Sequence, residues 1–321
     1  MTPGDAGLNP LGFGAASIGN LYRTVSDQQA WEAMDAAWRG GIRSFDTAPH
    51  YGLGLSEKRL GAYLRTRPRD EFVLSTKVGR LLEPNPDFAG GRDLAFDFDV
   101  PDDLVRRFDP SLAGIRRSLE ESLTRLGLDR IDIAYLHDPD VYDLERGLGE
   151  GLPALEQLRS EGLIGEIGVG VNDAEVAARA VREADLDIVM VAGRCSLLRP
   201  HGFDALIPDC VRRGTRIVAA SPFNSGLLAT RRPAPGALYD YLPASPELVA
   251  RVERMAAVCE RHGIDLPTAA LHFPLRLPQV VAVVVGTARA SAVTENLARI
   301  AAEVPEALWA ELESIDEEVG V

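Results

Sequence analysis

Eight short apolar runs, each six or seven residues long, alternate with longer amphipathic segments along the chain. The runs are rich in β-branched residues and almost continuously hydrophobic, which is typical of strands buried on both faces of a parallel sheet. We therefore predict strands over residues 11–16, 43–48, 72–78, 131–137, 166–171, 188–193, 216–221 and 281–286.

The segments between these runs carry apolar residues at helical spacing. Start and stop signals accompany several of them: Asp27 precedes a helix that Gly40-Gly41 ends, and Asp109-Pro110-Ser111 opens another that Gly127 ends. The predicted helices cover residues 27–40, 57–67, 111–126, 150–161, 173–184, 203–213, 245–262 and 266–275.

The alternation of eight strands with helices predicts an α/β protein of the (β/α)8 or TIM barrel type. A chain of 321 residues suits one barrel of about 250 residues with insertions, so we expect a single barrel domain over residues 1–321. The alternative is an open, doubly wound α/β sheet. A nucleotide-binding sheet of that kind carries GxGxxG after its first strand, whereas GFGAASIG begins inside the first strand, at Gly12, and lacks that spacing.

Two predicted connections are long, 79–110 and 226–245, and both follow the carboxyl ends of strands. Barrel enzymes place their active sites on that face, and long connections in compact domains are commonly functional. We expect residues 79–110 to form a substrate-side loop within the barrel domain. Its Phe88, Phe96 and Phe98 are candidates either to stack on an apolar substrate face or to anchor the loop itself.

The composition argues against several classes of function. A net charge of −14 repels phosphate backbones and anionic membrane surfaces, so neither nucleic acid nor a membrane is an expected partner. No apolar run reaches the roughly 20 residues that a membrane span needs, and the N-terminus lacks the basic and apolar regions of a secretory signal. The three widely spaced cysteines, Cys195, Cys210 and Cys259, favour reduced thiols in a cytoplasmic protein.

The histidines do not form a metal-binding pattern. They stand at positions 50, 137, 201, 262 and 272, and only His137 ends a predicted strand. A metal-dependent barrel hydrolase needs clustered His and carboxylate ligands at strand ends, so we expect no metal site. The sequence carries no signal for the oligomeric state.

Polar side chains stand at the ends of three consecutive predicted strands. The second strand ends around Asp46 and is followed by Tyr51, the third ends around Lys77, and the fourth ends at His137. Because the carboxyl ends of barrel strands meet at one rim, we expect these four side chains to lie together.

This set suits the transfer of a hydride between a carbonyl or alcohol carbon and a nicotinamide, which requires a proton to move at the oxygen. A free phenol has a pKa of about 10, and the Lys77 ammonium would favour the Tyr51 phenolate. Asp46 would pair with Lys77, which is costly to bury alone, and His137 would hold the reacting oxygen. Lys77 stands out further because, of 34 basic residues, only Lys58 and Lys77 are lysines.

The segment GIRSFDTAPHYGLGLSEKRLG resembles the signature of the aldo-keto reductase family around its catalytic Asp and Tyr. The strands that end with Lys77 and His137 match the family's next two catalytic positions in order, and the similarity runs from Leu11 to Leu297. The resemblance implies an NAD(P)-dependent oxidoreductase whose catalytic residues are Asp46, Tyr51, Lys77 and His137, with Tyr51 as the general acid/base.

The same resemblance implies where the cofactor binds. Asn172 resembles the residue that holds the nicotinamide carboxamide, although the Ser that usually precedes it is absent, and Ala192-Gly193-Arg194 replaces a family Gln. Residues 221–227 resemble the loop over the pyrophosphate, and VVVGTARASAVTENL resembles the adenosine site. The implied cofactor-binding residues are Asn172, Ser221, Phe223, Ser225, Gly226, Leu227, Gly286, Thr287, Arg289, Glu295 and Asn296.

The cofactor is expected to be NAD or NADP. Many NADP-specific members carry Lys and Arg at the 2′-phosphate site, whereas this chain has Gly286 and Ala292 there, which argues against strict use of NADP. Arg289 would either reach a phosphate or remain a solvated surface residue.

The segment FDPSLAGIRRSLEESLTRLGLDRIDIAYLHDPD and residues 192–194 resemble the branch of the family that contains L-fucose dehydrogenase, or D-threo-aldose 1-dehydrogenase, to which a pyridoxal 4-dehydrogenase is similar. This implies a small neutral sugar substrate, such as L-fucose, that is oxidised at C1 to its lactone while Tyr51 takes the proton of the anomeric hydroxyl. Oxidation of pyridoxal and general aldehyde or ketone reduction are the alternatives. In another class, some relatives are nucleotide-binding regulatory subunits, a role that the complete set of four polar residues disfavours.

Overall fold

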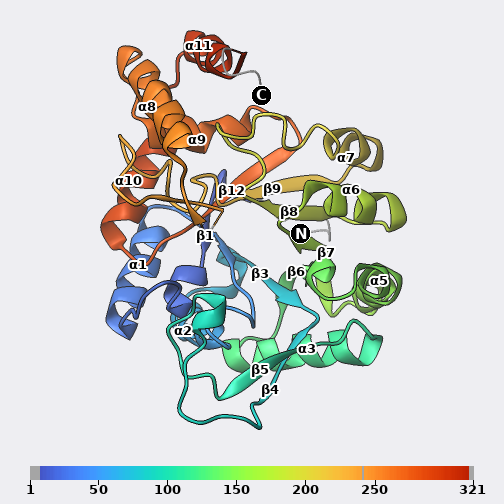
Figure 1. Cartoon of the computed structure of the whole chain (residues 1–321). Helices are drawn as coiled ribbons and strands as arrows, with labels where there is room; N and C mark the ends of the chain where they lie inside the picture. Colours follow the sequence, from blue (N-terminus) through green and yellow to red (C-terminus); the bar gives the residue numbers. More distant parts are fainter. Residues whose placement is uncertain (1–7, 241, 318–321) are drawn as a thin grey trace.

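The computed structural model describes residues 8–240 and 242–317, so both ends of the predicted 1–321 domain lie outside the described residues. Eight parallel strands close into a barrel in the order β1-β12-β9-β8-β7-β6-β3-β2, with helices packed around it (Figure 1). The predicted fold is confirmed. The barrel strands are β1 (Leu11–Gly14), β2 (Ser44–Asp46), β3 (Val73–Val78), β6 (Ile131–His137), β7 (Ile164–Val171), β8 (Ile188–Ala192), β9 (Arg216–Ala220) and β12 (Val280–Gly286).

A helix forms within or across each of the eight predicted helical segments. These are α1 (Asp27–Arg39), α2 (Leu55–Leu64), α3 (Leu112–Leu126), α5 (Leu152–Ser160), α6 (Ala174–Glu183), α7 (Ile207–Arg213), α8 (Pro246–Arg261) and α9 (Leu266–Leu275). Three further helices were not predicted: α4 (Leu144–Arg146), α10 (Ala290–Ile300) and α11 (Glu306–Glu317). The last of these lies beside α8 at the top of Figure 1.

Several helix starts differ from the prediction, and local chemistry explains them. The N-cap of α1 is Ser26 rather than Asp27, because Ser26 and Gln29 form a reciprocal capping box. Helix α7 begins at Ile207 instead of 203, since Pro208 is tolerated in a first turn but not in a helix interior. In the same way Pro153 lies at the start of α5.

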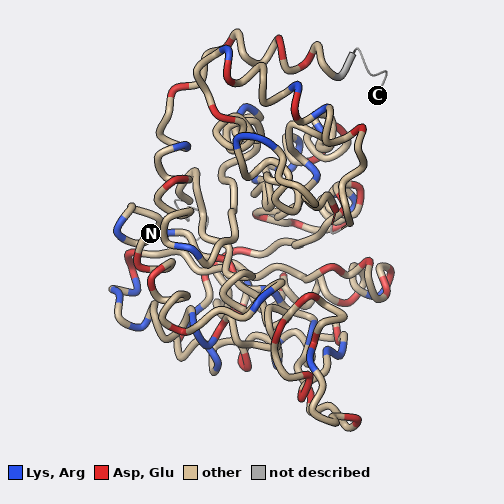
Figure 2. The backbone as a smooth tube through the Cα atoms, turned by 60° about the vertical axis from the view of Figure 1, so that its left-hand side comes forward, with Lys and Arg blue, Asp and Glu red and all other residues tan. Residues whose placement is uncertain are grey.

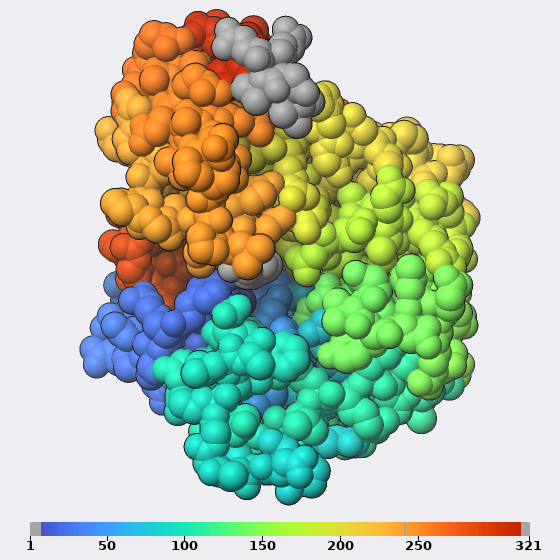
Figure 3. Space-filling model, in the orientation of Figure 1, coloured from blue at the N-terminus to red at the C-terminus, as the bar shows by residue number. Residues whose placement is uncertain are grey.

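The connection at 79–110, predicted as a loop, contains an antiparallel hairpin of β4 (Arg80–Pro84) and β5 (Leu104–Phe108). Residues of β5 alternate between half-buried and exposed, as expected of a strand with one solvated face. Among its described residues, the second long connection contains the two-residue strands β10 (Leu238–Tyr239) and β11 (Leu242–Pro243). On the face seen in Figure 3, the orange segment before α8 and the cyan-to-teal segment around β4 and β5 lie on either side of the blue N-terminal part of the chain.

The interior of the barrel is filled by side chains that alternate along the strands. Ile133 and Tyr135 of β6 pack with residues of β8, β9 and β12. Since side chains two positions apart share a face of a strand, His137 continues this inward-facing series at the carboxyl end of β6. The inward-facing positions of β6 therefore continue as far as the rim of the barrel, where the candidate site lies.

Acidic and basic residues are interspersed along the backbone of the outer helices (Figure 2). In the part of the chain that the structure describes, no helix is both long enough and apolar enough to cross a membrane.

A buried carboxylate joins three elements next to the candidate site. The Glu57 side chain on α2 is fully buried. It accepts hydrogen bonds from Arg125 Nε on α3 at 2.5 Å and from Thr76 Oγ1 on β3 at 3.0 Å. This pair fixes the start of α2, and with it the turn that precedes the helix.

We expect Glu57→Ala to lower the free energy of unfolding by about 3–5 kcal/mol, because it removes the nearest carboxylate of the largely buried Arg125, which keeps only Glu121 at 3.9 Å among the described ion pairs, and the acceptor of the buried Thr76 hydroxyl. Urea denaturation would measure this. Glu32→Ala is the matched control on an exposed site, where the change should stay within about 0.5 kcal/mol. Equal, small effects of the two variants would show that the Glu57 pair does not stabilise the fold.

Candidate active site

The three strands that carry the predicted polar residues are neighbours in the barrel, in the order β6-β3-β2. Asp46 is the last residue of β2, Lys77 stands one residue before the end of β3, and His137 is the last residue of β6. Tyr51 follows β2 in the turn that leads into α2. The structure thus brings all four residues together at the carboxyl rim, where barrel enzymes hold their catalytic groups.

The turn that presents Tyr51 is held on both sides. Thr47 Oγ1 and Ser56 Oγ share a hydrogen bond of 2.9 Å, and Ser56 Oγ donates to the Ala15 carbonyl at 2.8 Å. Gly52 has a φ of +62°, and a Cβ there would lie 2.1 Å from the carbonyl oxygen of Gly19. A glycine is therefore required next to Tyr51 for the turn to pack against residues 16–19.

Lys77 and Asp46 form a buried ion pair. The Lys77 Nζ donates to Asp46 Oδ2 at 2.7 Å and to the Thr47 carbonyl at 3.0 Å, while Ser75 Oγ donates to Asp46 Oδ1 at 2.8 Å. Burial favours the neutral amine, but Asp46 and Tyr51 together outweigh this effect and hold the pKa of Lys77 above its ordinary value. The lysine is therefore an ammonium across the physiological range.

The ammonium lies beside the Tyr51 phenol, with Nζ 4.7 Å from the ring centroid. Burial raises the pKa of Tyr51 above its ordinary value, and the charge of Lys77 opposes that rise. The phenol is consequently protonated at neutral pH in the protein alone, and Lys77 lowers the free energy needed to ionise it.

His137 is held neutral. Burial lowers its pKa well below the usual range, and the nearby cations of Arg80 and Lys77 act in the same direction. Its Nε2 lies 3.4 Å from Asp138 Oδ2, and Asp138 accepts a hydrogen bond from Arg80 Nη2 at 2.5 Å. Burial raises the pKa of Asp138 to about 6, against the effect of Arg80.

The structure adds four residues to the candidate site that were not predicted from the sequence: His50, Arg80, Arg106 and Asp138. His50, Arg80 and Asp138 each stand within three residues of a predicted site residue, so their position in the chain was an available signal. Arg106 lies on β5, and only the unpredicted hairpin brings it to the site, where its Nη2 donates to the His50 carbonyl at 3.0 Å.

The phenylalanines of the 79–110 connection differ in their placement. Phe98 is buried, with its ring centroid 6.1 Å from that of Tyr51 and 5.3 Å from that of His50. Phe96 is 47% exposed and its centroid lies 5.6 Å from His50. Phe88 is exposed, and no ring contact is found for it among the described residues. Two of the three therefore line the candidate site.

The predicted cofactor residues occupy the other part of the rim. Asn172 follows β7, residues 221–227 follow β9, and residues 286–296 follow β12, which is the barrel neighbour of β9. The predicted catalytic residues lie at the carboxyl ends of β2, β3 and β6 or, for Tyr51, in the turn after β2. An extended ligand bound along the rim would therefore reach from the end of β12 to the polar cluster at β6.

The segment after β9 has an unusual backbone. Ser221, Asn224, Ser225 and Gly226 all have positive φ values, a conformation that can turn backbone amides toward an anion. The Asn224 amide nitrogen donates to the Gly193 carbonyl at 3.1 Å, while its buried Oδ1 has no hydrogen-bond partner among the described residues. Ser221 and Gly226 are exposed, Phe223 and Ser225 are half-buried, and Leu227 is buried in the core.

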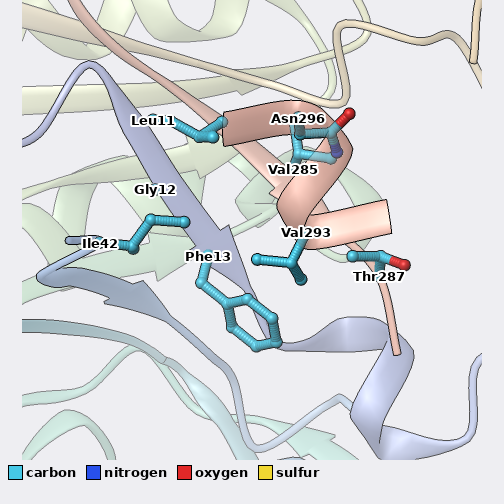
Figure 4. Close-up of a pocket in the computed structure, with 8 residues that line it drawn as sticks. All are labelled: Leu11, Gly12, Phe13, Ile42, Val285, Thr287, Val293 and Asn296. Atoms are coloured by element: carbon cyan, nitrogen blue, oxygen red, sulfur yellow. The ribbon is translucent and has the colours of Figure 1, made fainter. Parts of the chain in front are cut away.

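The segment after β12 surrounds the start of α10. Thr287 and Asn296 line a small, mainly apolar pocket together with strand residues such as Phe13 and Val285 (Figure 4). The side-chain Oδ1 of Asn296 already accepts from Arg299 Nη1 at 3.0 Å. Gly286, Arg289 and Glu295 are exposed, so these three residues are accessible to a ligand.

An ion-pair network covers the rim between β8 and β9. Asp240 accepts from Arg199 Nη2 at 2.6 Å and from Arg194 Nη1 at 3.1 Å, and Arg199 Nε donates to the Tyr239 hydroxyl at 2.6 Å. These bonds attach the 226–245 connection to the loop after β8. The sequence gives no local signal for this network, because its partners are about 40 residues apart in the chain. From the sequence alone, Arg194 is recognised only as part of the segment that replaces a family Gln.

Comparisons with known proteins agree with this geometry. Residues 10–317 match the model of the Aldo/keto reductase family. The chain is 54% identical over 303 residues to a D-threo-aldose 1-dehydrogenase of Pseudomonas sp, which covers 94% of this chain and 92% of that protein. It is 36% identical to a pyridoxal 4-dehydrogenase of Microbacterium luteolum, with 96% and 94% covered.

Among solved structures, the fold matches the holo form of aldo-keto reductase AKR11C1 from Bacillus halodurans. The TM-score is 0.74 at 25% sequence identity, and the match covers 96% of this chain and 92% of that chain. In the part of the chain that the structure describes, no group of three or more His, Cys, Asp or Glu side chains is placed to hold a metal ion.

Because the histidines of the candidate site are held neutral, we predict that the free energy of unfolding depends on pH. Burial, with Arg80, Arg106 and Lys77, lowers the pKa of His50 to about 2. Below about pH 6.5, such a histidine takes up a proton only when the chain unfolds, so acid favours unfolding. When the pH falls from 7 to 5, the neutral His50 should lower the free energy of unfolding by about 2 kcal/mol.

His50→Phe should therefore lose about 2 kcal/mol less than the parent chain over the same pH interval in urea denaturation. His201→Phe is the control, because His201 is exposed, and it should lose as much as the parent. If His50→Phe and the parent lose equal amounts, the histidine is not held neutral.

Proposed function

The chain belongs to the aldo/keto reductase family and is an oxidoreductase that acts on carbonyl or CH–OH groups with a nicotinamide cofactor, and we propose that it oxidises an aldose such as L-fucose at C1 to the lactone. The observation that carries this proposal is the 54% identity to a D-threo-aldose 1-dehydrogenase over nearly the full length of both proteins. The pyridoxal 4-dehydrogenase is less similar, at 36%, which favours the sugar over pyridoxal.

In this proposal Asp46, Tyr51, Lys77 and His137 are the catalytic residues. His137, which is neutral, donates a hydrogen bond to the anomeric oxygen and fixes its position. The Tyr51 phenolate takes the hydroxyl proton as the C1–O bond becomes a carbonyl. Lys77 stabilises that phenolate, and Asp46 keeps the ammonium in place at 2.7 Å. A nicotinamide dinucleotide held at the rim would supply the hydride acceptor for C1, and its reduced form would supply the hydride for the reverse reduction of a carbonyl.

The chain's own residues fit a dinucleotide along the rim. The positive-φ segment over residues 221–226 suits a pyrophosphate, and the unpartnered Asn224 Oδ1 can accept from an amide. We propose that Asn172, residues 221–227 and residues 286–296 hold it. Arg289 is exposed at the start of α10, where it can contact the 2′-phosphate of NADP but does not need that group as a partner. We therefore propose that the protein uses NAD or NADP.

The surroundings of Tyr51 suit a hydroxylated substrate. Phe98 and Phe96 offer aromatic faces to the apolar side of a sugar, and the buried Arg106 guanidinium lies 4.2 Å from the centroid of the Phe96 ring. The three cysteines are unpaired and buried, which supports a reducing compartment such as the cytoplasm.

The first test is a spectrophotometric assay of reduced nicotinamide with L-fucose, D-arabinose, L-galactose, pyridoxal and an aromatic aldehyde, each with NAD and with NADP. We expect turnover of one or more sugars. Tyr51→Phe should reduce the rate by about 10²–10⁴-fold, since general acid–base catalysis contributes that much. Tyr63→Phe, on α2 and hydrogen-bonded to Asp35, is the matched control and should keep its activity.

Turnover of pyridoxal alone would replace the substrate and leave the mechanism in place. Absence of any turnover, with nucleotide binding retained in a fluorescence titration, would favour the regulatory alternative over an enzyme of this substrate class.

The raised pKa of Tyr51 gives the oxidation a pH dependence. The base is the phenolate, and its pKa lies above the ordinary value of 10.0 in the protein alone. The phenolate fraction, and with it kcat/KM for sugar oxidation, should therefore rise by about tenfold per pH unit between pH 7 and pH 9. A profile that is flat over this range in steady-state assays would argue against Tyr51 as the base.

A further inference from the structure

We propose that His50 is a specificity-determining residue that binds the substrate hydroxyl next to the reacting carbon. The inference rests on the proposed function and names the part of the sugar that the site recognises. His50 directly precedes Tyr51, yet the proposed mechanism gives its side chain no task.

Three hydrogen-bonding rings converge at this point of the rim. The ring centroids of Tyr51 and His137 are 6.1 Å apart, that of His50 is 6.0 Å from Tyr51, and it is 5.6 Å from His137. The three rings thus form a nearly equilateral triangle. If Tyr51 and His137 hold the reacting oxygen, a polar group one carbon further along the substrate lies within reach of His50.

One ring nitrogen of His50 has an unsatisfied hydrogen-bonding capacity. Its Nδ1 is buried and has no hydrogen-bond partner among the described residues. The same holds for Nδ1 of His137 and for Nε of Arg80 and Arg106. A buried donor or acceptor without a partner costs about 1–3 kcal/mol, so four such atoms around one site favour a ligand that is rich in oxygen over an apolar aldehyde.

The surroundings also define the state of the His50 ring. Arg80, Arg106 and Lys77 face it from β4, β5 and β3, and with burial they keep it neutral. A neutral imidazole has one donor nitrogen and one acceptor nitrogen, and a hydroxyl can pair with whichever of the two faces it, because a hydroxyl both donates and accepts. A carboxylate or phosphate would need donors alone.

The ring has little freedom to turn away. Phe98 and Phe96 meet it edge to face at 5.3 Å and 5.6 Å. Arg106, which is held by Asp93 at 2.5 Å and 2.8 Å, donates to the His50 carbonyl. The hairpin therefore positions His50 from both its backbone and its side chain, as a residue that selects a substrate requires.

The test compares a sugar with the same sugar lacking the C2 hydroxyl. D-arabinose and 2-deoxy-D-ribose form such a pair, because removal of the C2 hydroxyl from D-arabinose gives 2-deoxy-D-ribose; L-fucose and 2-deoxy-L-fucose form a second pair. We expect His50→Phe to lower kcat/KM for the hydroxylated sugar about tenfold, the value of one lost hydrogen bond. For the 2-deoxy sugar the change should stay within about twofold.

His50→Gln retains a donor and an acceptor and should recover part of the lost kcat/KM for the hydroxylated sugar. If His50→Phe does not fold, His50→Gln and His50→Asn provide the comparison, since their donors and acceptors stand at different distances from the backbone. His201→Phe, on an exposed histidine, should leave both sugars unaffected.

Two failures can be told apart. If the parent chain turns over no aldose, the proposed function is wrong and this inference falls with it. If the parent chain oxidises aldoses but His50→Phe affects the hydroxylated and 2-deoxy sugars equally, or affects neither, the proposed function stands and the role of His50 is overturned.

Discussion

The buried ion pair between Lys77 and Asp46 is the interaction on which the candidate site depends. An isolated ammonium inside the barrel would be expelled or neutralised, because its desolvation costs several kcal/mol. Here Asp46, the Thr47 carbonyl and Ser75 together satisfy both partners of the pair. Since these residues belong to β2 and β3, the bonds that permit the charge also hold together the ends of the two strands from which Tyr51 is presented.

A second layer of charge surrounds the first. Arg80 and Arg106 are almost completely buried, and each is compensated by a carboxylate, Asp138 and Asp93 respectively. Burial, reinforced by the charges of these arginines and of Lys77, keeps both histidines of the site neutral, so they offer hydrogen bonds rather than ionic contacts. The hairpin of β4 and β5 carries both arginines. The barrel therefore supplies the proposed catalytic residues, and the inserted hairpin supplies the two arginines that flank them.

The features that could be predicted from the sequence are those that arise from residues close together in the chain. Strands buried on both faces produce continuous apolar runs, and a lysine within such a run is conspicuous because its burial requires a partner. The hairpin at 79–110 was missed because its pairing joins residues up to 28 positions apart, Arg80 with Phe108. His50 was passed over for the same reason, since its neighbours Phe96, Phe98 and Arg106 come from that hairpin. The helix α10 was interpreted only as a nucleotide-contact segment, although Val293 and Leu297 pack on the core at helical spacing.

The burial of Lys77 has a consequence for the amine chemistry of this protein. The chain contains two lysines, and the side chain of Lys77 is 3% exposed and carries a firmly bound proton. Acylating reagents attack only accessible, unprotonated amines, so Lys77 is protected both by its burial and by its bound proton. Lys58 is exposed on α2. Apart from the amino terminus, an acylating dye or a surface linker would therefore attach at one known position, on the outer face of the helix that follows Tyr51.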